Sequence, residues 1–313
     1  MDSLITICLT TYNRPNYLRI AIDSIINQSF KEFKLVILDN GSDDRTSELI
    51  STYNDNRIRY VRNKKNEREF INEAFNYHET RYMMITHDDD IMNINFLANQ
   101  INILENDNSI GVLASSINLI DKDGNELNRI RPRIFKNKIW KKTEFIKEYF
   151  FRGDIIPCPT CIFRSDIIKT NNLKYNFKVG PAVDLYLLFQ INFLDTKIFL
   201  TKTPLYKYRI HENQDSEQNR VNLEISLRPY LIKLLKEKKN EKILKHYKKS
   251  SAAIIFHIIL NQLLINKISF KDFKKLLNEN SFTSDLSINK YTVLWVLISL
   301  FRSTRDLILK KNE

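Results

Sequence analysis

The chain has 313 residues, 43% of them apolar and 11% aromatic, so it can bury a substantial core and is not a disordered tail. Its formal net charge is +12, and residues 221–313 carry 18 Lys/Arg against 8 Asp/Glu, a net +10. The three cysteines, Cys8, Cys158 and Cys161, are too few and too oddly numbered for a disulfide scaffold.

The N-terminal segment MDSLITICLTTYNRP has no basic stretch ahead of its short apolar run, so it is not typical of a secretory signal. No window of the sequence reaches the roughly 18 uninterrupted apolar residues that a membrane span needs. We therefore expect a cytoplasmic protein, and leave open a peripheral position at the inner face of the cell membrane.

Short β-prone runs alternate with helical patterns over about the first 120 residues. One helical pattern, 15–28, opens with proline at its first position, and the next, 43–53, opens with aspartates. This alternation predicts βαβ units and a mainly parallel sheet. The five predicted strands are Leu4–Leu9, Lys34–Leu38, Ile58–Arg62, Tyr82–Thr86 and Gly111–Ser116.

Polar segments follow three of these strands: TTYNR the first, DNGSDD the second and HDDD the fourth. In open parallel sheets, ligands bind beyond the carboxyl ends of the strands. Asp39 and Asn40 could hydrogen-bond the edge of a nucleobase, Gly41 would allow a sharp turn, and Tyr12 could stack on the base. Taken alone, however, DNGSDD is also an ordinary turn and helix-cap sequence.

Three adjacent carboxylates, Asp88, Asp89 and Asp90, end the fourth segment. Like charges repel and burial disfavours ionisation, so the cluster either stays in water or is offset by positive charge. Carboxylate oxygens favour Mg²⁺ or Mn²⁺ bound together with phosphates. A solvated loop is the alternative interpretation of the same three residues.

Together, in this order, the motifs resemble the nucleotide-sugar glycosyltransferases of family 2. The resemblance rests on residues 5–30, 34–50 and 82–92, is strong over about the first 115 residues and is moderate across 150–216. It implies a GT-A fold, an α/β architecture with a Rossmann-like, mainly parallel sheet flanked by helices. The catalytic domain would cover 1–220, and 221–313 would form a basic, helical C-terminal region.

The resemblance implies a donor site for a pyrimidine nucleotide-sugar. Thr10, Tyr12 and Arg14 would line it, and Asp39 with Asn40 would meet the base. Asn40 stands where an aspartate is commoner, which leaves the choice between uridine and thymidine open. We expect a UDP-sugar, with a dTDP-sugar, as in a rhamnosyltransferase, as the alternative.

The resemblance also assigns phosphate and metal contacts. Arg68 would lie near the diphosphate, although the glycines usual in that loop are missing. Asp88 and Asp89 match the ribose and metal positions of the DxD motif, and Asp90 is a further candidate ligand. His87 stands where many members have another aspartate, so the division of labour among these residues stays open.

The second half would supply the catalytic base. In VGPAVDLYLLFQI the usual Glu-Asp pair is Val183-Asp184, so Asp184 is the predicted base, with a helix N-cap as its alternative. In LYKYRIHENQDS, Arg209 would offset phosphate charge and His211 would contact the metal. The pair Cys158 and Cys161 lacks the second pair of a four-thiolate site, so we disfavour a redox or zinc role.

These roles imply an inverting transfer, with Mn²⁺ or Mg²⁺, to a saccharide or lipid-linked saccharide in surface polysaccharide assembly. A nucleotidyltransferase is the rival enzyme, but TTYNRPNY has no glycine-rich loop. The rival from another class is a basic nucleic-acid-binding protein. The C-terminal lysines of this chain, however, lie in leucine-rich helical sequence, so we expect no nucleic-acid partner.

The C-terminal region contains three apolar stretches between lysine-rich segments, namely Ile225–Leu235, Ala252–Ile265 and Tyr291–Phe301. The middle stretch is apolar nearly all round, which favours a buried helix. The last stretch is followed by arginines and lysines, a composition typical of an interfacial helix on an anionic membrane. Docking on a membrane and packing in a homodimer both stay open.

Overall fold

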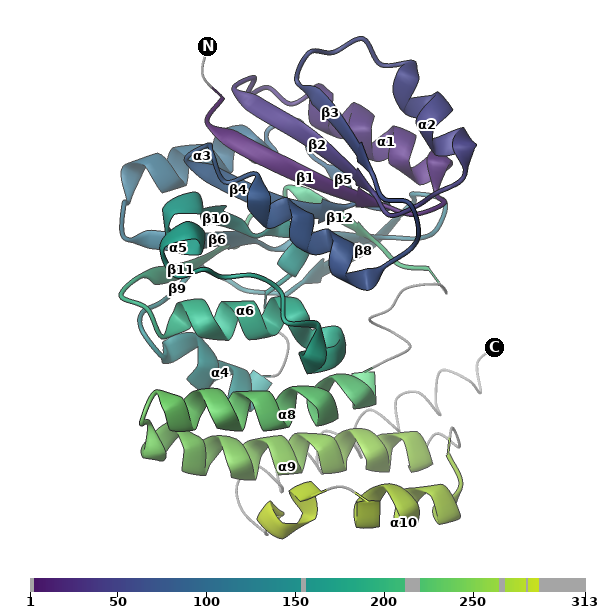
Figure 1. Ribbon diagram of the computed structural model, residues 1–313. Helices are drawn as coiled ribbons and strands as arrows, with labels where there is room; N and C mark the ends of the chain where they lie inside the picture. The colour runs from purple at the N-terminus through teal and green to yellow at the C-terminus, as the bar shows by residue number, and fades with distance from the viewer. Residues whose placement is uncertain (1–2, 153–155, 212–219, 265–267, 280, 287–313) are drawn as a thin grey trace. The chain divides into compact units, whose positions relative to one another are not determined.

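The computed structural model describes residues 3–152, 156–211, 220–264, 268–279 and 281–286 (Figure 1). By its internal contacts the chain divides into two compact units. The first unit holds Met1–Phe145, Asp154–Phe177 and Leu187–Asn213, and the second holds Ile146–Gly153, Lys178–Tyr186 and Gln214–Glu313. The predicted division at residue 220 differs from this one, because 146–153 and 178–186 group with the C-terminal part.

The first unit is built on an eight-stranded sheet with the strand order β3-β2-β1-β4-β10-β6-β11-β9. Strands β3, β2, β1 and β4 are parallel, as are β6 and β11, whereas β10 runs antiparallel to both of its neighbours. The strands are β1 (Ile5–Thr11), β2 (Phe33–Asp39), β3 (Ile58–Arg62), β4 (Tyr82–His87), β6 (Ile110–Ser115), β9 (Lys138–Trp140), β10 (Ile162–Arg164) and β11 (Lys197–Thr201). The mainly parallel sheet and the five strands expected from the sequence are confirmed.

Continuous apolar runs form the central strands because the sheet is covered on both faces. Alternate residues of β1 and β2, such as Ile7 and Leu35, share one core cluster with helices α1 (Pro15–Ile26), α2 (Asp44–Ser51) and α3 (Phe96–Asn106). In α1, buried apolar residues recur every three or four positions, the spacing of one helix face.

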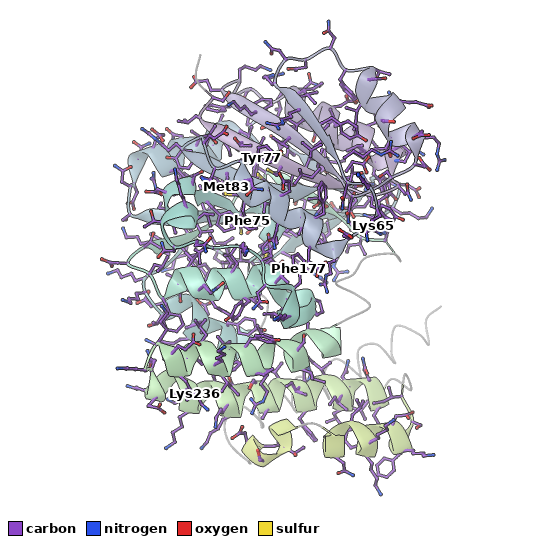
Figure 2. The ribbon with its side chains drawn as sticks, viewed as in Figure 1. Lys65, Phe75, Tyr77, Met83, Phe177 and Lys236 are labelled. Atoms are coloured by element: carbon purple, nitrogen blue, oxygen red, sulfur yellow. The ribbon has the colours of Figure 1, made fainter. Side chains whose placement is uncertain are left out.

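Cys8 belongs to the alternate set of β1 residues, which point to the opposite face of the sheet. Its thiol contacts the backbone oxygen of Ala74 in the 3₁₀ segment η1 (Arg68–Asn76). Figure 2 labels Phe75 of η1 and Met83 of β4, both buried. Burial raises the pKa of the Cys8 thiol to about 12, which keeps it protonated and unreactive. All three cysteines have free thiols.

A second, four-stranded sheet has the order β5-β12-β7-β8. It consists of β5 (Ile91–Met92), β7 (Ile117–Ile120), β8 (Glu126–Arg131) and β12 (Tyr206–Arg209). Strand β5 follows the three aspartates directly and pairs with β12, so a segment more than a hundred residues away in sequence returns to them.

The remaining elements of the first unit are η2 (Cys158–Thr160) and α5 (Ser165–Thr170). Helix α4 (Glu144–Arg152), η3 (Phe177–Ala182) and α6 (Val183–Asn192) each hold residues of both units.

The second unit is helical, with α8 (Arg220–Glu237), α9 (Glu241–Leu264), α10 (Phe270–Glu279) and η4 (Ser281–Asp285). Buried Arg228 of α8 donates to Ser251 in α9 and to Asp285 in η4. Ala252, Ile255 and Ile259 are buried in a cluster of this unit, which favours the packed-helix interpretation of the middle apolar stretch. The stretch Tyr291–Phe301 lies outside the described residues. Within the part of the chain that the structure describes, no helix combines the length and apolarity needed to cross a bilayer.

Candidate active site

The three polar motifs meet at one edge of the main sheet. In the parallel register, Thr11 pairs with Asp39 and Thr10 with His87, so the segments after β1, β2 and β4 leave the sheet side by side. β1 lies between β2 and β4, and the winding of the chain reverses there. In α/β sheets such a reversal opens a crevice beyond the strand ends.

Asp88 and Asp89 lie at this edge, with only 3% and 8% of their surfaces exposed. The Thr11 hydroxyl donates to Asp88 Oδ2 over 2.7 Å, and Arg14 Nη1 contacts Asp88 Oδ1 at 3.3 Å and Asp89 Oδ2 at 3.1 Å. His211 Nε2 lies 2.9 Å from the same Asp89 oxygen. The predicted metal and donor residues Asp88, Asp89, Arg14 and His211 are therefore brought together.

The electrostatics of this pair are unfavourable without positive neighbours. Burial, reinforced by the charge of Asp89, raises the pKa of Asp88 to about 6, while the hydrogen bond from Thr11 and the charge of Arg14 act in the opposite direction. Arg14 thus supplies positive charge beside Asp88 and Asp89, and the imidazole of His211 adds a hydrogen bond to Asp89.

Asp90 occupies a different environment. Its Oδ1 accepts from the backbone N–H of Arg209 at 3.0 Å, and its Oδ2 accepts from the Tyr206 hydroxyl at 3.1 Å. Burial raises the pKa of Asp90 well above its ordinary range. Because both oxygens bind β12, these contacts favour a structural role for Asp90 over the metal-ligand role predicted from the sequence.

Arg209 is likewise internal, with 2% of its surface exposed. Its Nε donates to the backbone oxygen of Asp89 at 2.8 Å, and its Nη1 donates to the backbone oxygens of Asp121 and Lys122, both at 3.1 Å. The guanidinium lies 4.6 Å from the centre of the Tyr17 ring. These contacts favour a role in fixing the aspartate segment rather than the predicted contact with phosphate.

Asp39 is fully buried and accepts two hydrogen bonds, from the backbone N–H of Ser42 at 2.8 Å and from the Tyr60 hydroxyl at 2.5 Å. Its carboxylate therefore organises the turn after β2. Gly41 in that turn has φ +83°, and a Cβ there would lie 2.6 Å from the backbone carbon of Lys65. The predicted need for glycine at this position is confirmed.

The partly buried Asn40 is the member of the predicted base-binding pair that keeps surface at this edge. Its amide nitrogen donates to Asn66 at 2.7 Å, and its oxygen accepts from the backbone N–H of Glu67 at 3.0 Å. Tyr12, directly after β1, is 42% exposed, and a residue that stacks on a base needs an exposed ring. Thr10 donates to the backbone oxygen of Thr86 at 3.2 Å.

Two further predicted residues belong to η1 and α6. Arg68 is exposed at the start of η1, with its guanidinium 5.6 Å from the centre of the Phe177 ring. Asp184 lies in the first turn of α6, in a segment of the second unit, and accepts a hydrogen bond from the backbone N–H of Leu185 at 2.6 Å. Its assignment as catalytic base stays a prediction.

Comparison with known proteins identifies the family. Residues 6–170 match the family model described as Glycosyl transferase family 2. The chain belongs to glycosyltransferase family 2.

Relatives are found among archaea and bacteria. An uncharacterized glycosyltransferase of Methanocaldococcus jannaschii is 32% identical to this glycosyltransferase over 224 residues, which cover 70% of this chain and 74% of that protein. One from Rickettsia typhi is 25% identical over 214 residues, covering 67% of this chain and 65% of that protein.

Solved structures show the same GT-A fold. S. aureus TarS 1–349 in complex with UDP-GlcNAc superposes with a TM-score of 0.67 at 16% identity, covering 89% of this chain and 79% of that one. The mannosyltransferase PcManGT of Pyrobaculum calidifontis, in complex with GDP-Man and Mn²⁺, gives a TM-score of 0.55 at 12% identity, covering 96% and 88%. The GT-A fold predicted from the sequence is confirmed.

The donor atoms of this glycosyltransferase suit a hard divalent cation, although the present arrangement is not a finished metal site. Among the described residues, no three His, Cys, Asp or Glu side chains are grouped so that they could hold a metal ion. His211 nevertheless contacts Asp89 Oδ2, Arg14 bridges that oxygen to Asp88 Oδ1, and carboxylate oxygens with one imidazole are suitable ligands for Mn²⁺. Together with substrate phosphates, donor atoms of this kind are the ones that Mn²⁺ or Mg²⁺ binds.

Sequence analysis did not identify several residues that lie around the aspartate segment. Thr11 follows from the register of β1 and β4, which the motif positions already implied. Tyr17 lies one turn beyond Arg14 on α1, and its hydroxyl donates to the backbone oxygen of Lys122 at 3.0 Å. Tyr206 gave no local signal, because its contact with Asp90 depends on the pairing of β5 and β12.

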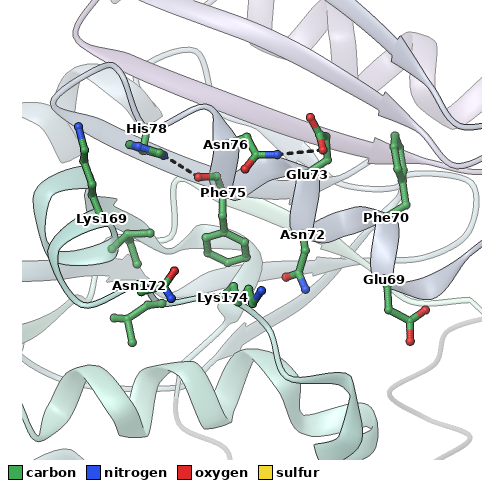
Figure 3. A pocket seen from close by; sticks show the side chains of 12 residues that line it. Glu69, Phe70, Asn72, Glu73, Phe75, Asn76, His78, Lys169, Asn172 and Lys174 are labelled. Atoms are coloured by element: carbon green, nitrogen blue, oxygen red, sulfur yellow. Dashed lines mark hydrogen bonds between the residues drawn. The ribbon is translucent and has the colours of Figure 1, made fainter.

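A groove of about 550 Å³ lies elsewhere on the first unit, between η1 and the region of α5 (Figure 3). Its polar lining includes His78, Lys169 and Lys174, and Figure 3 shows His78 hydrogen-bonded to the backbone oxygen of Phe75. None of the residues predicted for the donor site lines it. The carboxylate edge is therefore the better candidate for the active site.

We predict that Arg209→Lys destabilises the glycosyltransferase in the absence of nucleotide. A lysine cannot reproduce the fork that reaches three backbone oxygens, so the free energy of unfolding should fall by about 1–3 kcal/mol. Chemical denaturation measures this. Arg59→Lys is the matched control, because Arg59 is exposed and also lies over a tyrosine ring, that of Tyr77 at 5.1 Å. Unchanged stability with weakened UDP binding would restore the phosphate-binding role.

Proposed function

We propose that the protein is an inverting glycosyltransferase that moves a sugar from a pyrimidine nucleotide-sugar, a UDP-sugar in preference to a dTDP-sugar, to a saccharide or lipid-linked saccharide. Its role would be in surface polysaccharide assembly. The observation that carries this proposal is the convergence of Thr11, Asp88, Asp89 and His211 at the carboxyl edge of a family 2 GT-A sheet. TarS, whose solved complexes contain UDP-GlcNAc and UDP, supports the choice of uridine.

The donor would lie across the strand ends. The exposed ring of Tyr12 offers a stacking face for the base, and the Asn40 amide can both donate to and accept from a pyrimidine edge. Thr10 stands at the end of β1 between these groups and His87, its hydroxyl 2.9 Å from His87 Nδ1. Exposed Arg68 would approach the diphosphate.

Mn²⁺ or Mg²⁺ would be held by Asp88, Asp89 and His211. When bound, such a cation stabilises the charge that develops on the departing diphosphate. The PcManGT complex with Mn²⁺ supports this choice of cofactor. Buried Asp90 and Arg209 would keep the aspartate segment in place. The Asp90 carboxylate binds the backbone of β12, and the Arg209 guanidinium binds the backbone oxygen of Asp89.

The chemical step would be a single displacement. The acceptor hydroxyl attacks the anomeric carbon, the bond from that carbon to the diphosphate oxygen breaks, and Asp184 takes the hydroxyl proton. Inversion follows because the attack comes from the face opposite the leaving group. The nucleotidyltransferase and nucleic-acid-binding hypotheses find no support in a chain whose residues 6–170 match a glycosyltransferase family.

We predict that UDP raises the melting temperature of the protein, and that Mn²⁺ enlarges this rise. Binding to the folded state stabilises it by mass action, by about 2.7 kcal/mol at a ligand concentration of 100 Kd. A thermal-shift panel of UDP, dTDP, GDP and CMP with and without metal measures both effects. Asp89→Ala should remove the metal-dependent part. The proposal would be abandoned if no nucleotide shifted the transition.

We predict that Asp184→Asn retains UDP binding and lowers sugar transfer by ~10² to 10⁴, the usual scale for loss of a general base. Asp166→Asn is the matched control, because Asp166 also lies in the first turn of a helix and accepts from the next backbone N–H, at 2.8 Å. Transfer at the parent rate by Asp184→Asn would show that Asp184 only supports the start of α6.

We further propose that the second unit docks on an anionic membrane surface, where a lipid-linked acceptor would be found. Figure 2 marks Lys236 on α8, and six exposed lysines lie around the turn from α8 to α9, against the exposed acids Glu237 and Glu241. The six are Lys236, Lys238, Lys239, Lys242, Lys245 and Lys249. Each lysine near an anionic leaflet contributes about 1 kcal/mol.

We predict salt-sensitive binding to phosphatidylserine-containing liposomes that is lost when Lys238, Lys239, Lys242 and Lys245 are changed to Gln. Sedimentation at rising salt measures it. Changing four exposed lysines of the first unit, Lys31, Lys64, Lys136 and Lys142, is the control for net charge. Equal binding to neutral liposomes contradicts docking by charge, and a change of oligomeric state in the α8–α9 variant would favour a homodimer surface instead.

A further inference from the structure

Two arginines contact the aspartate segment, and the structure holds them differently. Arg209 is buried and its guanidinium donates to three backbone oxygens. The side chain of Arg14 is 35% exposed, and its Nη1 contacts the carboxylates of Asp88 and Asp89. Arg14 can therefore leave for solvent without breaking backbone contacts of the kind that fix Arg209.

The side chain of Arg14 also does not cap the helix that it precedes. Arg14 is the N-cap residue of α1, and its side chain makes no capping hydrogen bond. Helix α1 is instead initiated by Pro15 and held by the buried Leu18 and Ile22. The guanidinium instead forms ion pairs with the carboxylates of Asp88 and Asp89.

One carboxylate oxygen is shared by two positive or proton-bearing groups. Asp89 Oδ2 lies 3.1 Å from Arg14 Nη1 and 2.9 Å from His211 Nε2. A divalent cation at this oxygen would lie against the guanidinium, and repulsion between them would oppose its binding.

We propose that Arg14 is an exchangeable counter-ion of the donor site. It neutralises Asp88 and Asp89 while the site is empty, yields Asp89 to the divalent cation, and then binds the diphosphate of the donor. This inference rests on the proposed function, since it requires that cation.

The second position of Arg14 follows from its chemistry and its place in the chain. It lies in the segment that leaves β1, two residues beyond Tyr12, at the edge where the donor would bind. A guanidinium presents paired N–H donors that match phosphate oxygens, and it remains charged at all relevant pH values. Release of Arg14 by the cation would therefore create a diphosphate ligand, so cation and nucleotide would strengthen each other's binding.

The experiment compares the full chain with Arg14→Gln. Binding of Mn²⁺ alone is measured from the signal of free Mn²⁺ in electron paramagnetic resonance, and binding of UDP is measured by calorimetry with and without Mn²⁺. We expect Arg14→Gln to bind Mn²⁺ about 10-fold more tightly and to lose most of the gain in UDP affinity that Mn²⁺ gives the parent, on the usual scale of coupling between two sites. Arg14→Lys should keep Mn²⁺ affinity near the parent value.

Two further variants secure the interpretation. Arg19→Gln, which removes an exposed arginine from the same helix, should leave both affinities unchanged. Asp89→Asn in the Arg14→Gln background should abolish the tightened Mn²⁺ binding, because a neutral amide with one oxygen replaces the carboxylate.

Unchanged Mn²⁺ affinity with weaker UDP binding would make Arg14 a fixed phosphate ligand and overturn the exchange. A lower melting temperature with both affinities unchanged would leave it a purely structural role. If neither the parent nor Arg14→Gln bound Mn²⁺, the exchange would also be wrong. A transfer assay with a UDP-sugar on the same preparation would then show whether the proposed function holds without a cation.

Discussion

The need to offset three adjacent carboxylates at the end of a buried strand governs the architecture of this glycosyltransferase. Buried carboxylates are costly unless they accept hydrogen bonds or face positive charge. Asp88 is bound by Thr11 and Arg14, Asp89 by Arg14 and His211, and Asp90 by Tyr206 and the backbone of Arg209. These partners come from two segments, 11–14 and 206–211, that are far from the aspartates in sequence, so satisfying the cluster brings three parts of the chain to one edge.

The second, smaller sheet supports the same aspartate segment. Strand β5 starts directly after Asp90, pairs with β12, and β12 in turn pairs with β7. Buried Arg209 at the end of β12 binds the backbone oxygens of Asp89 and Asp121. Buried groups thereby fix the backbone of the carboxylates that would hold a cation. Arg14, which contacts the carboxylate oxygens themselves, is partly exposed. A rigid support and a movable counter-ion suit a site that binds charged ligands and releases a charged product.

The sequence predicted what local pattern can determine. The strands, the first two helices and the meeting of the polar motifs at one edge follow from apolar periodicity and from the parallel sheet that it implies. The predicted ligand-binding roles of Asp39, Asp90 and Arg209 rest on side-chain chemistry and motif position, and the structure favours internal roles for all three. The mutual contact of Asp90 and Arg209 could not be read locally, because it spans 119 residues of sequence. The grouping of 146–153 and 178–186 with helices that follow much later has no local signal in the sequence either.

The measurement that tests this account most directly is a crystal structure of the full chain with UDP and Mn²⁺, with anomalous data collected at the manganese edge. The account predicts an anomalous peak coordinated by Asp89 and His211, UDP across the ends of β1, β2 and β4, and the Arg14 guanidinium on the diphosphate. A nucleotide bound elsewhere, for example in the groove beside η1, would contradict the assignment of the active site. A peak at Asp89 with Arg14 still bridging Asp88 and Asp89 would contradict the exchange.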